Sequence, residues 1–299
     1  MFRSVEFLLF FIVIMTLNGC SEEIEHNNTL LPSKIELLQG DWVTEKHQHG
    51  SYLLNFHISI EDSMFTLFSE YSDSVYFTIN KDFITVYHSN DTITFGSYQN
   101  YYIDTLNHEK LVLIAKSKKV KKRLVDFSFN SDTLFFSKVH KKNDLKPLRI
   151  AFSSTGCYGS CPSMKIEVED DLSVKFYGSI YSDIEGGYEG EIDNENYKRL
   201  INQVQYLELD SLKTEYIASW TDDQTKYLII ETVDTIYKTK VYGAYQQPVE
   251  LTILLNNLMD LYKRLDLEES EHIDDLKSFD KFLKISYPIQ PPPIPELIE

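Results

Sequence analysis

The chain has 299 residues, 42% of them hydrophobic, and a formal net charge of −17 at pH 7. This length and apolar content are enough for sizeable cores, fit two domains better than one, and exclude a globally disordered protein. Residues 148–299 hold 14 Lys and Arg against 28 Asp and Glu, a net charge of −14. Such acidity excludes nucleic acid as a partner, because nucleic-acid binding needs a basic surface.

Residues 1–19 have the pattern of a signal peptide. Arg3 supplies a positive charge, and Phe7 to Leu17 is an apolar run with Thr16 as its one polar residue. The run is too short for a membrane-spanning helix, which needs about 20 apolar residues, but it suits the core of a signal peptide.

The next four positions, Leu17-Asn18-Gly19-Cys20, resemble the lipobox of bacterial lipoproteins. The resemblance implies cleavage before Cys20 and a lipid on its sulfur, so that the protein is anchored to a membrane without spanning it. We expect residues 20–33 to form a flexible tether, and its acidic start resembles export signals of lipoproteins bound for the outer membrane. The expected location is therefore the bacterial cell envelope, at the outer membrane.

Residues 34–147 are expected to form an all-β domain. Apolar and polar residues alternate in short runs with Asn, Asp and Ser between them, as in half-buried antiparallel strands. The clearest runs are residues 53–60, 75–79, 83–87, 111–115 and 125–129. These runs predict an antiparallel meander that closes as a barrel or a sandwich.

The head of this domain, Leu37-Leu38-Gln39-Gly40-Asp41-Trp42, resembles the start of lipocalin-like domains. There a Gly-x-Trp segment closes one end of an up-and-down barrel. The resemblance implies that the interior could carry an apolar small ligand. A barrel filled by its own side chains is the alternative, and we favour it.

Residues 148–267 predict an α+β domain. Strands are expected at 148–152, 164–168 and 174–177, and a hairpin at 227–241. Asp193 or Asn194 can cap a helix that runs to Tyr206, and Pro248 can begin a second helix with a leucine-rich face. The remaining residues, 268–299, predict a short helix over 274–283 followed by a proline-rich tail that must be extended.

Two cysteines remain after lipidation, in Thr155-Gly156-Cys157-Tyr158-Gly159-Ser160-Cys161-Pro162. Outside the cytoplasm, thiols this close are expected to form a disulfide. The Thr-Gly-Cys-x-Gly-x-Cys-Pro pattern resembles the signature of a family of secreted and lipid-anchored bacterial proteins, a domain of unknown function that covers about residues 148–265. This resemblance implies a fold and no activity.

The same cysteines also resemble the Cys-x-x-x-Cys-Pro motif of copper-delivery proteins. Those proteins continue with a helix and use a distal histidine, whereas residues 164–168 alternate like a strand and His272 is the one histidine after Cys161. Copper binding or thiol redox chemistry through Cys157 and Cys161 is therefore the alternative to a structural disulfide.

The sequence contains no recognisable catalytic motif, and the carboxylates of Thr221-Asp222-Asp223 are expected to serve a loop. We therefore expect a lipid-anchored envelope protein that is not an enzyme and has no cofactor, acting in binding or envelope maintenance. Its possible partners are an envelope protein or, through the first domain, an apolar ligand.

Overall fold

The computed structural model describes residues 33–44, 47–49, 52–54, 57–61, 64–68, 74–87, 99–118, 121–122, 131–243 and 246–273. The predicted signal peptide, Cys20 and the segment 274–299 lie outside these residues, as does the run predicted at 125–129. No helix among the described residues is both long enough and apolar enough to cross a membrane.

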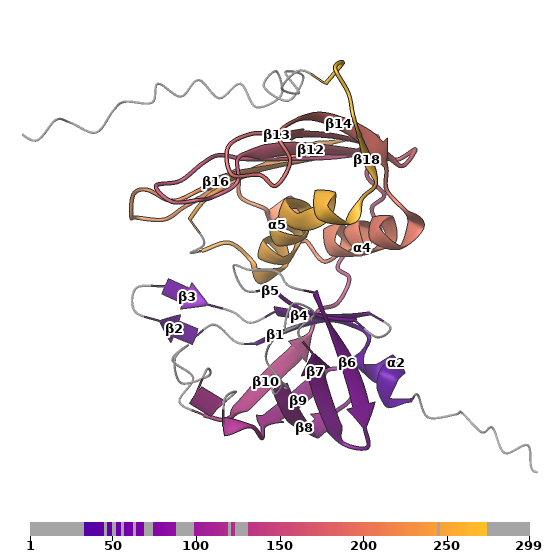
Figure 1. Ribbon diagram of the computed structural model, residues 1–299, viewed down its shortest axis with the longest axis vertical. Coiled ribbons are helices and arrows are strands. Elements are labelled where there is room, and N and C mark those ends of the chain that lie inside the picture. The colour runs from indigo at the N-terminus through magenta and orange to yellow at the C-terminus, as the bar shows by residue number, and fades with distance from the viewer. Residues whose placement is uncertain are drawn as a thin grey trace, which may run out of the picture. The chain divides into compact units, whose positions relative to one another are not determined.

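The first half is a closed antiparallel barrel (Figure 1). Its strands follow one another around the barrel in the order of the chain, and the last pairs with the first. A short helix, α2 (Lys34–Leu38), precedes the barrel, and β2 (His47–His49) and β3 (Tyr52–Leu54) form a separate ribbon. The barrel strands are β1 (Gly40–Thr44), β4 (His57–Glu61), β5 (Met64–Phe68), β6 (Ser74–Asn80), β7 (Phe83–Tyr87), β8 (Gln99–Leu106), β9 (Lys110–Ala115) and β10 (Thr133–Lys138).

Alternation along the strands places one apolar set inside the barrel. In β9, for example, Leu111, Leu113 and Ala115 are buried, and the residues between them are less so. The indole of Trp42 is fully buried and donates a hydrogen bond from Nε1 to the carbonyl of Leu38, 2.7 Å away. These side chains belong to one apolar core cluster, so the described strands contribute their inward side chains to a packed interior.

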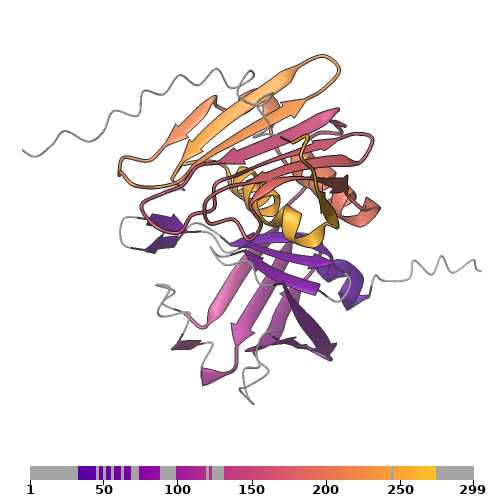
Figure 2. The same cartoon turned by 45° about the horizontal axis from the view of Figure 1, so that its top comes forward.

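The second half contains a single eight-stranded sheet (Figure 2). The strands lie in the order β15-β17-β16-β11-β12-β13-β14-β18, and all pairs are antiparallel except β15 with β17. The first strand of this half, β11, therefore lies inside the sheet, between β12 and the much later β16. The strands are β11 (Arg149–Ser154), β12 (Met164–Glu169), β13 (Ser173–Gly178), β14 (Gly186–Glu191), β15 (Glu215–Ile217), β16 (Thr225–Glu231), β17 (Ile236–Tyr242) and β18 (Leu267–Glu269).

Two helices, α4 (Asn194–Gln205) and α5 (Val249–Leu261), pack on one face of this sheet. Two short 3-10 helices, η1 (Leu209–Ser211) and η2 (Tyr262–Arg264), follow them. The helices contribute Leu200, Val204, Leu254 and Leu258 to the main core, which they share with inward side chains of the sheet such as Phe152. We call the opposite face of the sheet the outer face.

The predicted elements of this half are present at or near their expected bounds. Asp193 caps α4 by accepting a hydrogen bond from the backbone nitrogen of Asn196, and Pro248 precedes α5. The segment after Cys161 is strand β12, as its alternation predicts. In the first half, the run predicted as one strand over 53–60 is divided between β3 and β4.

Candidate functional site

A disulfide closes the connection between β11 and β12. The sulfur atoms of Cys157 and Cys161 are bonded, as the sequence predicts, and their Cα atoms are 5.5 Å apart. We call residues 155–162 the disulfide loop. The bond leaves neither sulfur as a free thiol in this structure, so metal binding at the pair would first need its reduction.

The base of the disulfide loop is held by a buried amide. Nε2 of Gln224 donates to the carbonyl of Thr155 at 3.0 Å and to that of Pro162 at 2.8 Å, which joins the two ends of the loop. The hydroxyl of Ser154 donates to the same Pro162 carbonyl at 2.7 Å. The loop is therefore fixed at its base as well as by its disulfide.

The segment 220–224 supports the loop from the side. The backbone nitrogen of Tyr158 donates to the carbonyl of Asp222, a residue in the left-handed region with φ of 71°. Asp223 accepts hydrogen bonds from Nε1 of Trp220 at 2.8 Å and from the backbone nitrogen of Gln224 at 2.7 Å. The carboxylate of Asp223 thus orders this segment, and the Asp222 carbonyl positions the loop.

Three large side chains project into solvent beside the disulfide. Tyr158, inside the loop, is 91% exposed, and Ile180 and Tyr181 in the turn after β13 are also exposed. This turn is joined to the end of the loop, since the Ser163 nitrogen donates to the Ile180 carbonyl and the Ser179 nitrogen donates to the Ser163 carbonyl, both at 2.9 Å. We call Tyr158, Ile180 and Tyr181 the exposed apolar set.

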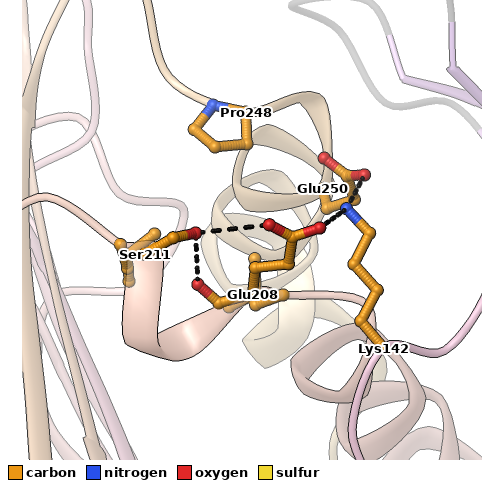
Figure 3. A pocket seen from close by; sticks show the side chains of 7 residues that line it. Lys142, Glu208, Ser211, Pro248 and Glu250 are labelled. Atoms are coloured by element: carbon orange, nitrogen blue, oxygen red, sulfur yellow. Dashed lines mark hydrogen bonds and ion pairs between the residues drawn. The ribbon is translucent and has the colours of Figure 1, made fainter.

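A second polar arrangement lies where the chain enters this half. Lys142 Nζ is 2.9 Å from Glu250 and 3.4 Å from Glu208, at a pocket of about 170 Å³ that Ser211 and Pro248 also line (Figure 3). Burial acts to lower the pKa of Lys142, but the two carboxylates outweigh it and raise that pKa above its ordinary value. The lysine is thus held as a cation by ion pairs within the protein.

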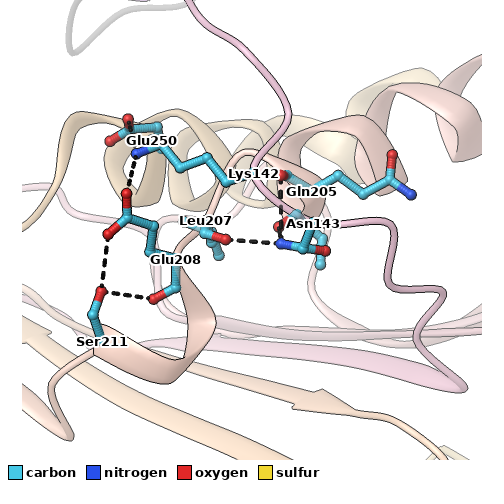
Figure 4. Close-up of polar contacts among 8 residues, drawn as sticks. Lys142, Asn143, Gln205, Leu207, Glu208, Ser211 and Glu250 are labelled. Carbon is cyan, nitrogen blue, oxygen red and sulfur yellow. Dashed lines mark hydrogen bonds and ion pairs between the residues drawn. The ribbon is translucent and has the colours of Figure 1, made fainter.

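The next residue, Asn143, binds the C-terminal end of α4. Its Nδ2 donates to the carbonyl of Leu207 at 2.8 Å, and the Lys142 nitrogen donates to the carbonyl of Gln205 at 2.7 Å (Figure 4). Carbonyls at the end of a helix lack partners within the helix. The Lys142 nitrogen and the Asn143 amide supply these partners, and they thereby fix the entering chain to the end of α4.

The residues proposed for metal chemistry are not brought together. His272 is exposed in the segment after β18. Within the ranges that the structure describes, no three His, Cys, Asp or Glu side chains are grouped so that they could hold a metal ion. Copper binding stays a prediction, as does lipidation of Cys20, which lies outside the described residues.

Sequence reasoning missed Gln224 and Ser154, the side chains that hold the base of the disulfide loop. Gln224 lies 69 residues from Thr155 in the chain, and a glutamine in a loop has no periodic pattern. Only the proximity of β11 and β16 in the sheet brings the amide to the loop.

Residues 148–262 match a family model described as a domain of unknown function (DUF6438). The match includes the disulfide loop and Gln224, and it agrees with the resemblance carried by the cysteine signature. No curated protein matches the chain.

Proposed function

We propose that this protein is a lipid-anchored binding protein of the bacterial envelope, that it is not an enzyme, and that the disulfide loop is its recognition surface. The observation that carries the proposal is the 91% exposure of Tyr158 on a loop fixed by a disulfide and by Gln224. The lipobox-like segment ending at Cys20 supports the anchor. The meander order of the barrel supports a lipocalin-like first domain.

A rigid loop that presents an aromatic side chain suits binding. Tyrosine offers a large amphipathic surface, and it is enriched where proteins recognise one another. A loop already fixed loses little conformational entropy when a partner binds, so more of the contact energy appears as affinity. Ile180 and Tyr181 enlarge the apolar surface beside Tyr158.

The polar groups at the base of the loop favour binding over catalysis. The hydroxyl of Ser154, the amide of Gln224 and the carboxylate of Asp223 each make hydrogen bonds that hold the loop or its neighbour in place. A catalytic acid, base or nucleophile must instead be directed at a substrate.

The anchor is tested by replacing Cys20. In cells fed radiolabelled palmitate, the parent protein is expected to take up label and to fractionate with membranes, whereas Cys20→Ala is expected to take up none. Cys157→Ala is the matched control, since this cysteine lies in the folded half. Label retained by Cys20→Ala would contradict lipidation at this residue.

The recognition surface is tested by photo-crosslinking in intact cells. A photoreactive amino acid at position 158 is compared with one at position 233, because Val233 is 79% exposed beyond the opposite end of β16. We expect one discrete adduct from position 158 only, and loss of that adduct when Tyr181→Ala is added. Equal adducts from both positions, or none from position 158, would contradict the proposal.

A further inference from the structure

The surface around the disulfide loop carries carboxylates and no basic side chain. It consists of the loop itself, the turn 179–186 and the segment 219–224, which hydrogen bonds join to the loop or its end. We call these three segments the loop surface. They contain Asp183, Glu185, Asp222 and Asp223 but no Lys, Arg or His, and Glu185 and Asp222 are exposed. An anionic partner would therefore be repelled here.

Two lysines follow or contact the segments of the loop surface. Lys263 Nζ lies 3.4 Å from Asp183 in the turn and 3.1 Å from Asp260, so its charge is balanced within the fold. Lys165 follows the disulfide loop on β12, but both of its neighbours point into the core, and its own side chain therefore points to the outer face. These two lysines are paired within the fold or directed to another face.

The fold holds two residues of this surface in an unfavourable backbone conformation. Tyr181 has φ of 63° and Asp222 has φ of 71°, in the left-handed region that costs energy for residues with a bulky side chain. The hydroxyl of Ser182 fixes the turn by donating to the carbonyls of Ser179 and Ile184, both at 2.7 Å. Backbone strain that the surrounding structure maintains is concentrated at functional sites, and here it accompanies an exposed tyrosine.

Exposed tyrosines together with exposed carboxylates suit arginine. A guanidinium is planar, so it can stack on an aromatic ring and donate two parallel hydrogen bonds to a carboxylate. Tyr158 and Tyr181 supply the rings, and Glu185 and Asp222 supply the acceptors. Lysine would meet the same carboxylates only as a point charge. The loop surface therefore favours a cationic partner, and arginine over lysine.

We infer that the partner of the loop surface is a basic protein segment, whose arginines pair with Glu185 and Asp222 and whose apolar side chains pack on the exposed apolar set. The inference rests on the proposed function, since it concerns the same recognition surface, and it adds the charge and residue type of the partner. The net charge of −14 over residues 148–299 attracts such a segment at long range and speeds the encounter.

Peptide binding to the full-length protein in detergent tests the partner's chemistry. The probe is a fluorescent peptide of arginine, leucine and serine, followed by fluorescence anisotropy. Two comparison peptides have lysine or glutamate in place of every arginine. We expect the arginine peptide to bind several-fold more tightly than the lysine peptide, and the glutamate peptide not to bind. Equal affinity for arginine and lysine, or binding of the glutamate peptide, would overturn the inference.

Two double variants with the same change in net charge locate the binding. Glu185→Gln with Asp222→Asn alters the loop surface, and asparagine tolerates the positive φ at position 222. Glu191→Gln with Asp234→Asn is the matched control, because Glu191 ends β14 and Asp234 is exposed in the turn after β16, both at the other end of the sheet. We expect the first pair to weaken binding of the arginine peptide several-fold and the second to leave it unchanged. Equal weakening would mean that the peptide responds to total charge, which would overturn the inference.

The adduct from position 158 in intact cells separates this inference from the proposed function. If that adduct forms but the arginine peptide binds no better than the glutamate peptide, the recognition surface stands and the cationic partner is wrong. If the peptide binds through Glu185 and Asp222 but no adduct forms in cells, the preference for arginine is supported and the role of the surface in the envelope is wrong.

Discussion

The amide of Gln224 bonds two carbonyls that belong to opposite ends of the disulfide loop. Replacement by leucine keeps the bulk of the side chain but removes both donors. The Thr155 carbonyl then loses this hydrogen bond, and the Pro162 carbonyl keeps the one from the Ser154 hydroxyl. We expect Gln224→Leu to lower the free energy of unfolding by about 1–3 kcal/mol, measured by urea denaturation. Gln246→Leu is the matched control at an exposed position and is expected to change it by less than about 0.5 kcal/mol. Equal effects would show that the two hydrogen bonds do not stabilise the loop.

Asp41 makes the barrel sensitive to acid. Burial acts to raise the pKa of Asp41, but His57, whose Nε2 lies 2.7 Å from Oδ1, lowers that pKa below the usual 3.8. The carboxylate's contribution to stability is therefore complete above about pH 4 and is lost as the pH falls from 3.8 through the lower pKa of the folded state.

Replacing Asp41 tests whether its carboxylate causes the loss of stability in acid. In Asp41→Asn we expect lower stability at pH 7 and a smaller further loss as the pH falls below 3.8 than in the parent protein. The urea midpoint, measured at each pH, checks this. Asp104→Asn, at an exposed site in β8, should keep the parent profile. The assignment is wrong if Asp41→Asn loses stability with acid as steeply as the parent does.

Among the elements, those with a local signal could be predicted from the sequence. The alternation of β12 and β13 and the caps at Asp193 and Pro248 depend on neighbouring residues, and the structure has these elements at nearly the expected bounds. β14 was not predictable, since its residues Gly-Gly-Tyr-Glu-Gly-Glu contain one large apolar side chain. β15 and β18 have three residues each and exist only because a sheet edge is there to pair with.

Gly187 shows why β14 contains glycine where the chain packs closely against it. An alanine methyl group there would be 2.2 Å from the Ile273 carbonyl oxygen and 2.9 Å from that of Ser270. We expect Gly187→Ala to lower the thermal midpoint by several degrees, for a cost of about 1–3 kcal/mol. Gly156→Ala is the matched control, because no heavy atom beyond the two neighbouring residues lies within 4 Å of the added Cβ. A neutral Gly187→Ala would mean that the chain after β18 does not pack on this strand.

On the scale of the whole molecule, the interior of the barrel is relevant to the alternative hypothesis that the first domain carries an apolar ligand. Trp42, Ile58, Ile60, Leu113 and Phe136 are buried together in one cluster. These side chains of the described strands occupy interior space that an apolar ligand would need. We therefore expect no fatty acid or lipid in stoichiometric amount when residues 24–299 are purified, extracted with solvent and analysed by mass spectrometry. A stoichiometric lipid would instead establish the first domain as a carrier.

The position of β11 inside its sheet has a consequence for the order of folding during synthesis. The N-terminal residues of the chain emerge first, so Cys157 and Cys161 become available long before Gln224 does. The disulfide spans four positions in sequence, whereas the pairing of Ile150 with Ile230 spans 80. Closing a short loop is fast and long-range pairing is slow. Cys157 and Cys161 can therefore be oxidised before the later strands of the sheet are available. The disulfide can then form before Gln224 makes the hydrogen bonds that hold the base of the loop.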